Sequence, residues 1–228
     1  AGLAFGLAQL LKFSSFLLFR VFLFLVIIRA ILDRKNSNFW KEFWSNLKPY
    51  FWVCVISLVT VWIIYIPFVW KTPVGIEHEL IDRNLTLDPR TLPLRNFLHA
   101  LEGNPITRAI GHYLLGVMLV FSRVAGGNAT FALGHLSDKS ISWFFPFAWL
   151  VKTPISIIIL FFWSIIALFT TKFYKDKAKF WTISVFLMPW LVYWAITMKG
   201  QLNIGIRHLM PTVPFVLLLI GYTLNSVW

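Results

Sequence analysis

The sequence predicts an all-α polytopic membrane protein, and three observations carry this prediction. The 228-residue chain is 58% hydrophobic and only 13% charged, whereas soluble proteins have roughly 25% charged residues. Several apolar runs approach the ~20 residues that a helix needs to cross the hydrocarbon core of a bilayer. The basic residues behind the net charge of +12 lie mostly beside these runs, which favours anionic lipid headgroups over nucleic acid as their partners.

The apolar runs predict about five membrane helices, at residues 13–31, 51–70, 144–171, 180–198 and 212–228. The only cysteine, Cys54, falls inside the second of them, so there is no disulfide framework. Both ends of the chain lie within apolar runs. We therefore expect an internal piece of a longer polytopic protein.

Two glycines and one arginine stand out before the second expected span. Gly2 and Gly6 have the G-x-x-x-G spacing, which allows close approach of two membrane helices. Arg20 is the one charge that falls deep in the first expected span, and intramembrane charges are typical of functional sites.

The charges of the loops predict the orientation in the membrane. Residues 31–50 and 172–179 carry an excess of lysine and arginine, which marks the cytoplasmic side. The long hydrophilic loop at residues 71–143 is then on the outer face, most simply of a plasma membrane. It contains two amphipathic segments, residues 92–101 and 109–122, which we expect to lie as helices along the membrane surface. The second has about fourteen residues, too few for a span.

The third expected span is preceded by aromatic residues of the kind that gather where a membrane meets water. They run from Trp143 to Trp149 and are followed by Lys152, Thr153 and Pro154. Threonine is a good helix cap and proline suits the first helical position. This pattern predicts a helix start with a lysine at its outer end.

The three expected spans that enter from the outside each carry a basic residue and a hydroxyl residue near that entry. These are Lys12 with Ser14, Lys152 with Thr153, and Arg207 with Thr212. A helix N-terminus with an added cation attracts phosphate. Lys152, Arg207 and Lys12 are thus candidate ligands of a lipid phosphate, and His208 either joins them or caps its loop. The alternative is that the cations are anchors that snorkel to the interface.

The sequence gives weaker grounds for a metal site. Glu77, His78, Glu79 and Asp82 could hold a divalent cation, but acidic loops are usually just solvated. No metal ligand and no cofactor are assigned.

Residues 111–154 resemble the bacterial and archaeal membrane glycosyltransferases related to protein O-mannosyltransferases. The likeness lies in a Y-L-x-G-like piece, a G-N-x-T-like turn, an F-x-L-G piece, and an aromatic-proline segment that leads into K-T-P. Residues 2–15 (GLAFGLAQLLKFSS) and 203–215 (NIGIRHLMPTVPF) agree with two further segments of the family. The matching stretches cover about a third of the chain and follow the family's order.

The resemblance implies a GT-C fold and transfer of a sugar from a polyprenyl- or dolichyl-phosphate-linked donor to an acceptor on the outer face. The acceptor would be a protein, a lipid or a glycan. The family's catalytic aspartate follows its first membrane helix, which would place it upstream of Ala1. No catalytic residue is therefore assigned in this chain, and we expect the segment alone to be inactive. Two other classes stay open, a lipid or solute transporter (or flippase) and a non-catalytic membrane assembly subunit.

Overall fold

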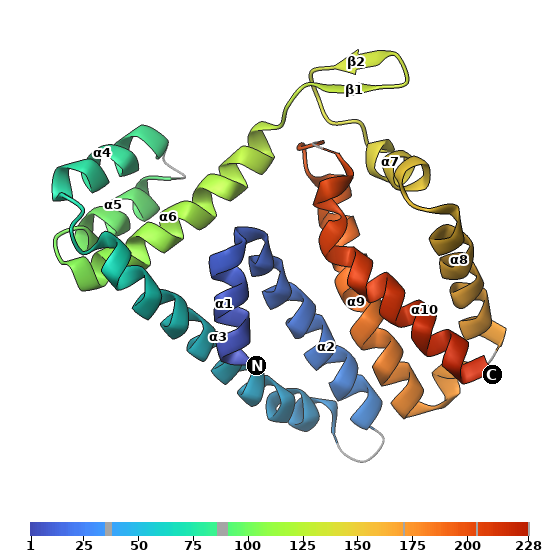
Figure 1. Ribbon diagram of the computed structural model, residues 1–228. Helices are drawn as coiled ribbons and strands as arrows, with labels where there is room; N and C mark the ends of the chain where they lie inside the picture. The colour runs from blue at the N-terminus through green and yellow to red at the C-terminus, as the bar shows by residue number, and fades with distance from the viewer. Residues whose placement is uncertain (35–37, 86–90, 171, 204, 228) are drawn as a thin grey trace. The chain divides into compact units, whose positions relative to one another are not determined.

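The computed structural model describes residues 1–34, 38–85, 91–170, 172–203 and 205–227, and these residues are almost entirely helical (Figure 1). The α-helices of this part of the chain are α1 (Gly2–Leu11), α2 (Leu18–Asp33), α3 (Phe39–Val69), α4 (Val74–Asn84), α5 (Leu92–Leu101), α6 (Pro105–Gly126), α7 (Phe144–Lys152), α8 (Ile155–Thr170), α9 (Lys177–Lys199) and α10 (Val213–Val227). Short elements complete the chain, namely the 3-10 helices η1 (Phe13–Leu17), η2 (Phe173–Lys175), η3 (Ile206–His208) and η4 (Met210–Thr212), and the strands β1 (Thr130–Ala132) and β2 (His135–Ser137).

The prediction of an all-α polytopic membrane protein is confirmed. Within the described residues, four helical segments are long and apolar enough to cross a membrane. They are Phe13–Asp33, Phe39–Val69, Pro105–Gly126 and Lys177–Lys199. A fifth span results if the bent pair of α7 and α8 is counted as one. The helices form two compact units, Ala1–Phe16 with Phe51–Arg123, and Leu17–Tyr50 with Val124–Trp228, and each is described by itself.

In the first unit, α1 packs closely against α3 through its two glycines. A Cβ atom on Gly6 would lie 2.8 Å from the carbonyl oxygen of Ser57, and one on Gly2 would lie 2.7 Å from Cβ of Ile56. The G-x-x-x-G spacing thus marks a close helix contact, as the sequence indicated. The side chain of Gln9 is buried here; its amide donates to the Ser57 hydroxyl and its carbonyl accepts from Tyr113 on α6.

Helix α6 is longer than the sequence suggested, since it has 22 residues instead of the expected fourteen. Arg108 and Arg123, which flank the predicted segment at residues 109–122, both lie inside it. Arg108 is tolerated there although it is only 3% exposed, because its guanidinium donates to the carbonyl oxygens of Glu102 and Thr72. The expected length was wrong, and α6 is long enough to span; its placement along the membrane surface stays a prediction.

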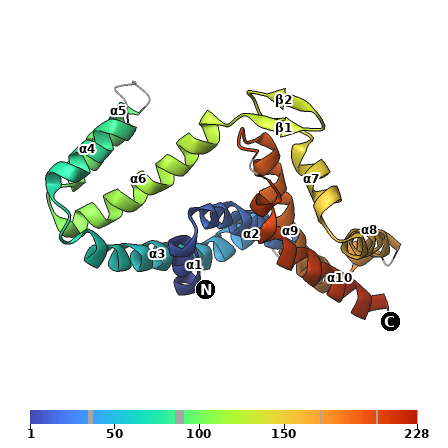
Figure 2. The same cartoon turned by 45° about the horizontal axis from the view of Figure 1, so that its top comes forward.

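Helices α4 and α5 lie side by side near the N-terminal part of α6 (Figure 2). The bounds of α5 match the predicted amphipathic segment at residues 92–101. Its Leu98 is buried in a cluster with Ile81 of α4 and Leu115 of α6. The apolar face of α5 thus packs on neighbouring helices, whereas Phe97, the residue before Leu98, is 51% exposed.

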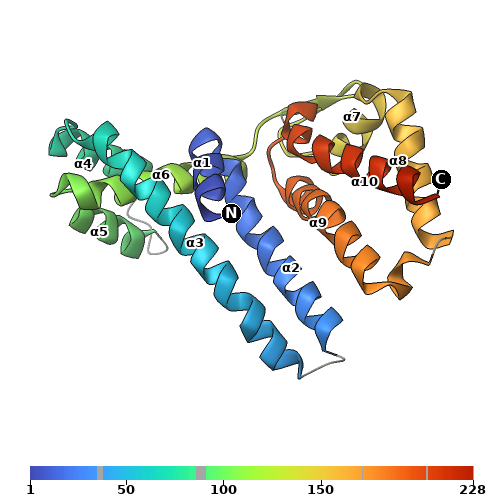
Figure 3. The ribbon, with the colours of Figure 1, turned by 60° about the horizontal axis from the view of Figure 1, so that its bottom comes forward.

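In the second unit, α9 packs against α2 and α10, and α10 also packs against α8 (Figure 3). The Thr223 hydroxyl of α10 donates to the Ser164 hydroxyl of α8 at 2.7 Å, and both side chains are buried. The third and fifth expected spans are therefore neighbours. Helix α10 itself has 15 residues, fewer than the ~20 of a full span.

The third expected span, residues 144–171, is not one straight helix. The chain bends by 116° between helices α7 and α8. Pro154 has no N–H and disfavours helical backbone in the residue before it, and Thr153 is accordingly extended (φ −92°, ψ 138°). Thr153 also donates its backbone N–H to Trp149, so it ends α7. The proline therefore produces a sharp bend inside an apolar stretch, where we expected a single helix to begin.

Candidate functional site

A cavity of about 200 Å³ lies at the bend between α7 and α8. Its walls come from the bend itself and from the short helices η3 and η4 that precede α10. The lining residues are Trp149, Lys152, Thr153, Pro154, Ile157, Ile206, Leu209, Met210, Val213 and Val216. All but Lys152 and Thr153 are apolar, so the cavity combines apolar walls with one cationic side chain.

Local features of the sequence shape this cavity. The bend turns Lys152, the last residue of α7, to the cavity. Directly before Ile206, which lines the cavity, Gly205 has a φ of 94°, a left-handed conformation that favours glycine, and the chain then enters η3. Trp149 is 7% exposed and packs edge-on against the rings of Phe161 and Trp194.

Three of the four predicted phosphate ligands belong to these neighbouring elements. Lys152 lines the cavity and is exposed. Arg207, also exposed, and the half-buried His208 lie on η3, which contacts α7, and the His208 ring is 6.5 Å from that of Phe145. Lys12 is an exposed residue at the C-terminal end of α1 in the other unit. The proximity of α7 and η3 agrees with a shared site for Lys152 and Arg207, and their binding of phosphate stays a prediction.

Of the hydroxyl residues paired with Lys152 and Arg207 in the sequence, only Thr153 lines the cavity. Thr212 is buried, and its hydroxyl donates to the carbonyl oxygen of Leu209 at 2.6 Å. Its hydrogen is therefore used within η4 and would not be given to a ligand. Thr153 remains at the cavity wall beside Lys152.

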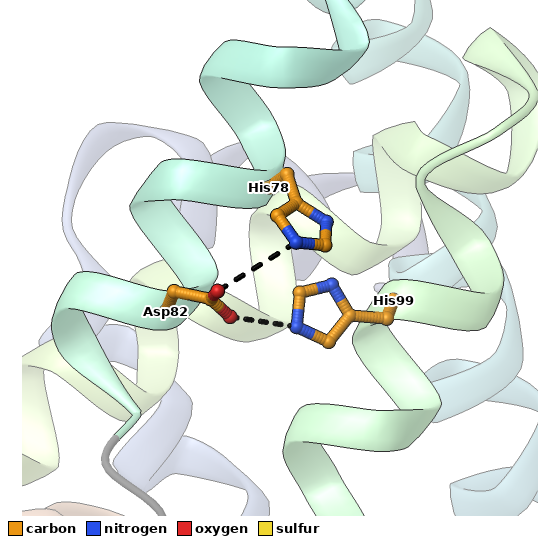
Figure 4. A group of neighbouring side chains, drawn as sticks. All are labelled: His78, Asp82 and His99. Carbon is orange, nitrogen blue, oxygen red and sulfur yellow. Dashed lines mark hydrogen bonds and ion pairs between the residues drawn. The ribbon is translucent and has the colours of Figure 1, made fainter.

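A second group of functional side chains lies on α4 and α5 in the first unit (Figure 4). His78 and Asp82 are one helical turn apart on α4, and His99 comes from α5. Asp82 Oδ1 is 2.8 Å from His99 Nε2, and Asp82 Oδ2 is 3.6 Å from His78 Nε2. The two imidazole rings lie 4.4 Å apart between their centroids. We call these three residues, together with Glu102, the histidine–carboxylate cluster.

Glu102 closes the histidine–carboxylate cluster from the other side. Its Oε1 lies 2.9 Å from His78 Nδ1, and its Oε2 lies 3.0 Å from His99 Nδ1. Each imidazole therefore has one nitrogen on Glu102 and the other directed at Asp82. Arg95 adds a guanidinium, whose Nε and Nη2 donate to Asp82 Oδ1 at 3.0 and 2.6 Å.

These contacts shift the pKa values of the cluster. The hydrogen bond with Glu102 raises the pKa of His78 above its ordinary value. The hydrogen bonds from Arg95, and then His99, lower the pKa of the Asp82 carboxyl. For Glu102, burial raises the carboxyl pKa, but the two histidines outweigh it and the net pKa is lowered. The lowered pKa values favour ionised carboxylates at Asp82 and Glu102, and the raised pKa of His78 favours its protonated form.

Sequence reasoning named His78 and Asp82 but missed His99, Glu102 and Arg95. It also treated Glu77 as part of the same group, whereas Glu77 faces α6 and its Oε2 lies 2.9 Å from His112 Nδ1. The spacing of four between His78 and Asp82, and of three between His99 and Glu102, was a signal for shared helix faces.

The family resemblance of residues 111–154 has no independent support from known proteins. A comparison of the chain with protein-family models, curated proteins and solved structures found no match.

Proposed function

We propose that this chain is part of a membrane glycosyltransferase that uses a polyprenyl-phosphate-linked sugar and acts on the outer face of a plasma membrane. One observation carries the proposal: the cavity at the bend of α7 and α8 has apolar walls and a single lysine at its edge. An isoprenoid phosphate has the same division into an apolar chain and an anionic end. The resemblance of residues 111–154 to glycosyltransferases points to the same class.

The dimensions of the cavity limit what it would hold. Pockets that enclose a drug-sized ligand measure about 300–1,000 Å³, whereas this cavity has about 200 Å³. It suits the phosphate and the first part of the chain, with the remaining isoprene units in the bilayer. Lys152 and Arg207 would then face the phosphate, with His208 beside them.

In such a transfer the bond between the sugar and the phosphate breaks, and negative charge grows on the leaving lipid phosphate. Fixed cations at that position stabilise the transition state more than the ground state. The base that activates the acceptor is assigned to no residue of this chain, and transfer is a property of the full-length protein.

The experiment that tests this function uses the full-length protein in detergent with a polyprenyl-phosphate sugar and candidate acceptors. We expect the free polyprenyl phosphate to be released in step with sugar transfer, and mass spectrometry to find an isoprenoid phosphate among the lipids that co-purify. If intact donor is never cleaved under any acceptor condition and no isoprenoid phosphate is bound, the proposal fails.

A transporter is the second candidate, and the bent helix pair is the observation that favours it. Discontinuous helices line substrate sites in many transporters, and α7 and α8 form such a pair. A transporter or flippase would carry the lipid between leaflets of a proteoliposome without breaking its sugar–phosphate bond. The two activities are therefore separated by measuring donor cleavage and donor movement in the same vesicles.

The outer-face position of residues 71–143 is tested by single cysteines in a Cys54→Ala background. The exposed residues Glu79, Lys139 and Lys175 are replaced one at a time. An impermeant thiol reagent should label Glu79→Cys and Lys139→Cys in intact cells, and should label Lys175→Cys only after permeabilisation. Labelling of Glu79→Cys and Lys139→Cys from opposite sides would mean that α6 spans the membrane. Labelling of Lys139→Cys and Lys175→Cys from one side would mean that α7 and α8 form a re-entrant loop.

A further inference from the structure

The histidine–carboxylate cluster lies in the first unit and shares no residue with the lining of the proposed lipid-phosphate cavity. Its members come from two helices, so the arrangement is a product of how α4 packs on α5. The question is what this arrangement binds. We propose that His78, Asp82 and His99 form a site for a divalent transition-metal ion, best suited to Zn²⁺, and that Glu102 positions both histidines.

The donor atoms have the right separation. One ligand atom from each of the three residues lies within 4.8 Å of the others, and His78 Nε2 is 3.6 Å from Asp82 Oδ2. A tetrahedral zinc ion with bonds of about 2.05 Å keeps neighbouring ligand atoms about 3.3 Å apart. The observed separation of His78 and Asp82 is close to that edge, so this pair needs little movement to admit the ion.

Glu102 orients both imidazoles for metal binding. Since both Nδ1 atoms lie against its carboxylate oxygens, each histidine donates its Nδ1–H there. In a neutral imidazole the lone pair is then on Nε2, and both Nε2 atoms face Asp82 (Figure 4). Without a metal, a proton lies between His99 Nε2 and Asp82 Oδ1, which are 2.8 Å apart; a zinc ion would take the place of that proton, because metal ligands must be deprotonated. Histidine ligands that donate their second nitrogen to a carboxylate are the usual support of a protein-bound zinc ion.

Arg95 leaves room for the ion. Both of its hydrogen bonds go to Asp82 Oδ1, so Oδ2 is the oxygen available to the metal. The guanidinium also fixes the carboxylate plane, as partners of ligating carboxylates commonly do.

The ligand types select the metal. Two imidazole nitrogens with one carboxylate oxygen suit zinc and its first-row neighbours, whereas Mg²⁺ and Ca²⁺ prefer oxygen ligands alone. Three protein ligands leave a fourth position open to water or to an oxygen of a substrate. The His78 side chain is 54% exposed and that of Asp82 is 38% exposed, so solvent reaches this side of the site.

The test measures Zn²⁺ binding by the full-length protein, purified without a polyhistidine tag, in competition with a chromogenic chelator. We expect about one Zn²⁺ per chain, and no displacement by an excess of Mg²⁺. Glu102→Gln should weaken binding by about 10- to 100-fold, as expected for a carboxylate that supports a histidine ligand. His78→Ala and His99→Ala should weaken it more, because each removes a ligand. His135→Ala, at an exposed histidine on β2, is the matched control and should bind as the parent does.

A second measurement covers variants that fold poorly. Zn²⁺ should raise the thermal unfolding temperature of the parent and of His135→Ala, but not that of the near-isosteric Asp82→Asn variant. Co²⁺ should give the visible absorption of a four-coordinate site in the parent and in His135→Ala, but not in Asp82→Asn. If the folded parent binds no Zn²⁺, the group is an ion-pair cluster of protonated histidines and the proposal is overturned. It is equally overturned if Zn²⁺ binds with the same affinity in the His78, His99 and Asp82 variants.

Discussion

Alanine at Arg207 or at Lys152 should slow sugar transfer by the full-length protein by about 30- to 1000-fold. This corresponds to roughly 2–4 kcal/mol of lost transition-state stabilisation, the range for removing one fixed electrostatic contact. The physical reason is the charge that grows on the leaving lipid phosphate, which each cation would neutralise. Turnover with a polyprenyl-phosphate sugar measures the effect, and the donor KM separates loss of binding from loss of rate.

The two cations should differ in what they tolerate. Arginine grips phosphate with two parallel hydrogen bonds, whereas lysine acts as a point charge. Arg207→Lys should therefore slow turnover more than Lys152→Arg. Lys152 lines the cavity, and a guanidinium at that position can still reach an anion at its mouth.

Lys175→Ala is the matched control, because this exposed lysine lies on η2, beyond the other end of α8. It should retain native turnover. Native turnover in folded Arg207→Ala and Lys152→Ala would show instead that both residues are interface anchors. A loss in the control equal to that in the two variants would point to a general effect of charge on the protein in its membrane.

The parts of the fold that follow from local pattern were predictable. Helix α5 was placed at residues 92–101 because its leucines recur with helical spacing, and its bounds agree. The bend between α7 and α8 was not predicted, since Lys152, Thr153 and Pro154 indicate where a helix starts but not the direction in which it runs. The length of α6 was missed because the predicted segment stopped short of the charged Arg108. The burial of Arg108 depends on hydrogen bonds to the carbonyl groups of Glu102 and Thr72. The pattern of neighbouring residues does not predict these contacts.

In the candidate sites, too, the residues that share one helix were predictable, whereas their partners on other elements were not. The sequence could place His78 and Asp82 on one face of a helix, because a spacing of four residues does so. It could not show that this face meets α5, where His99 and Glu102 lie, since the pairing of two short helices depends on Ile81, Leu98 and the packing around them. At the bend, Lys152 was identified from its neighbours in the chain. The apolar wall opposite, with Ile206 and Leu209, became visible only in the structure.

The buried pair of Glu77 and His112 should be the most sensitive point in the packing of α4 on α6. Glu77 is 2% exposed, and its two carboxylate oxygens lie 2.9 and 3.2 Å from His112 Nδ1. His112→Phe leaves the carboxylate buried without this partner, and breaking a buried pair from one side costs about 3–5 kcal/mol. Since the His112 side chain is 37% exposed, we expect the lower end, about 3 kcal/mol. The free energy of unfolding of the full-length protein in detergent is the quantity to measure.

The double variant shows where that loss comes from. In Glu77→Leu with His112→Phe the unpartnered charge is gone, and apolar replacements of a buried ion pair are often neutral or stabilising. The double variant should therefore regain most of the stability that His112→Phe loses. Glu79→Gln, at the exposed acidic residue two positions along α4, is the control and should change the free energy of unfolding by no more than about 0.5 kcal/mol. If His112→Phe and the double variant are equally destabilised, the imidazole contributes packing alone and the ion pair does not hold α4 on α6.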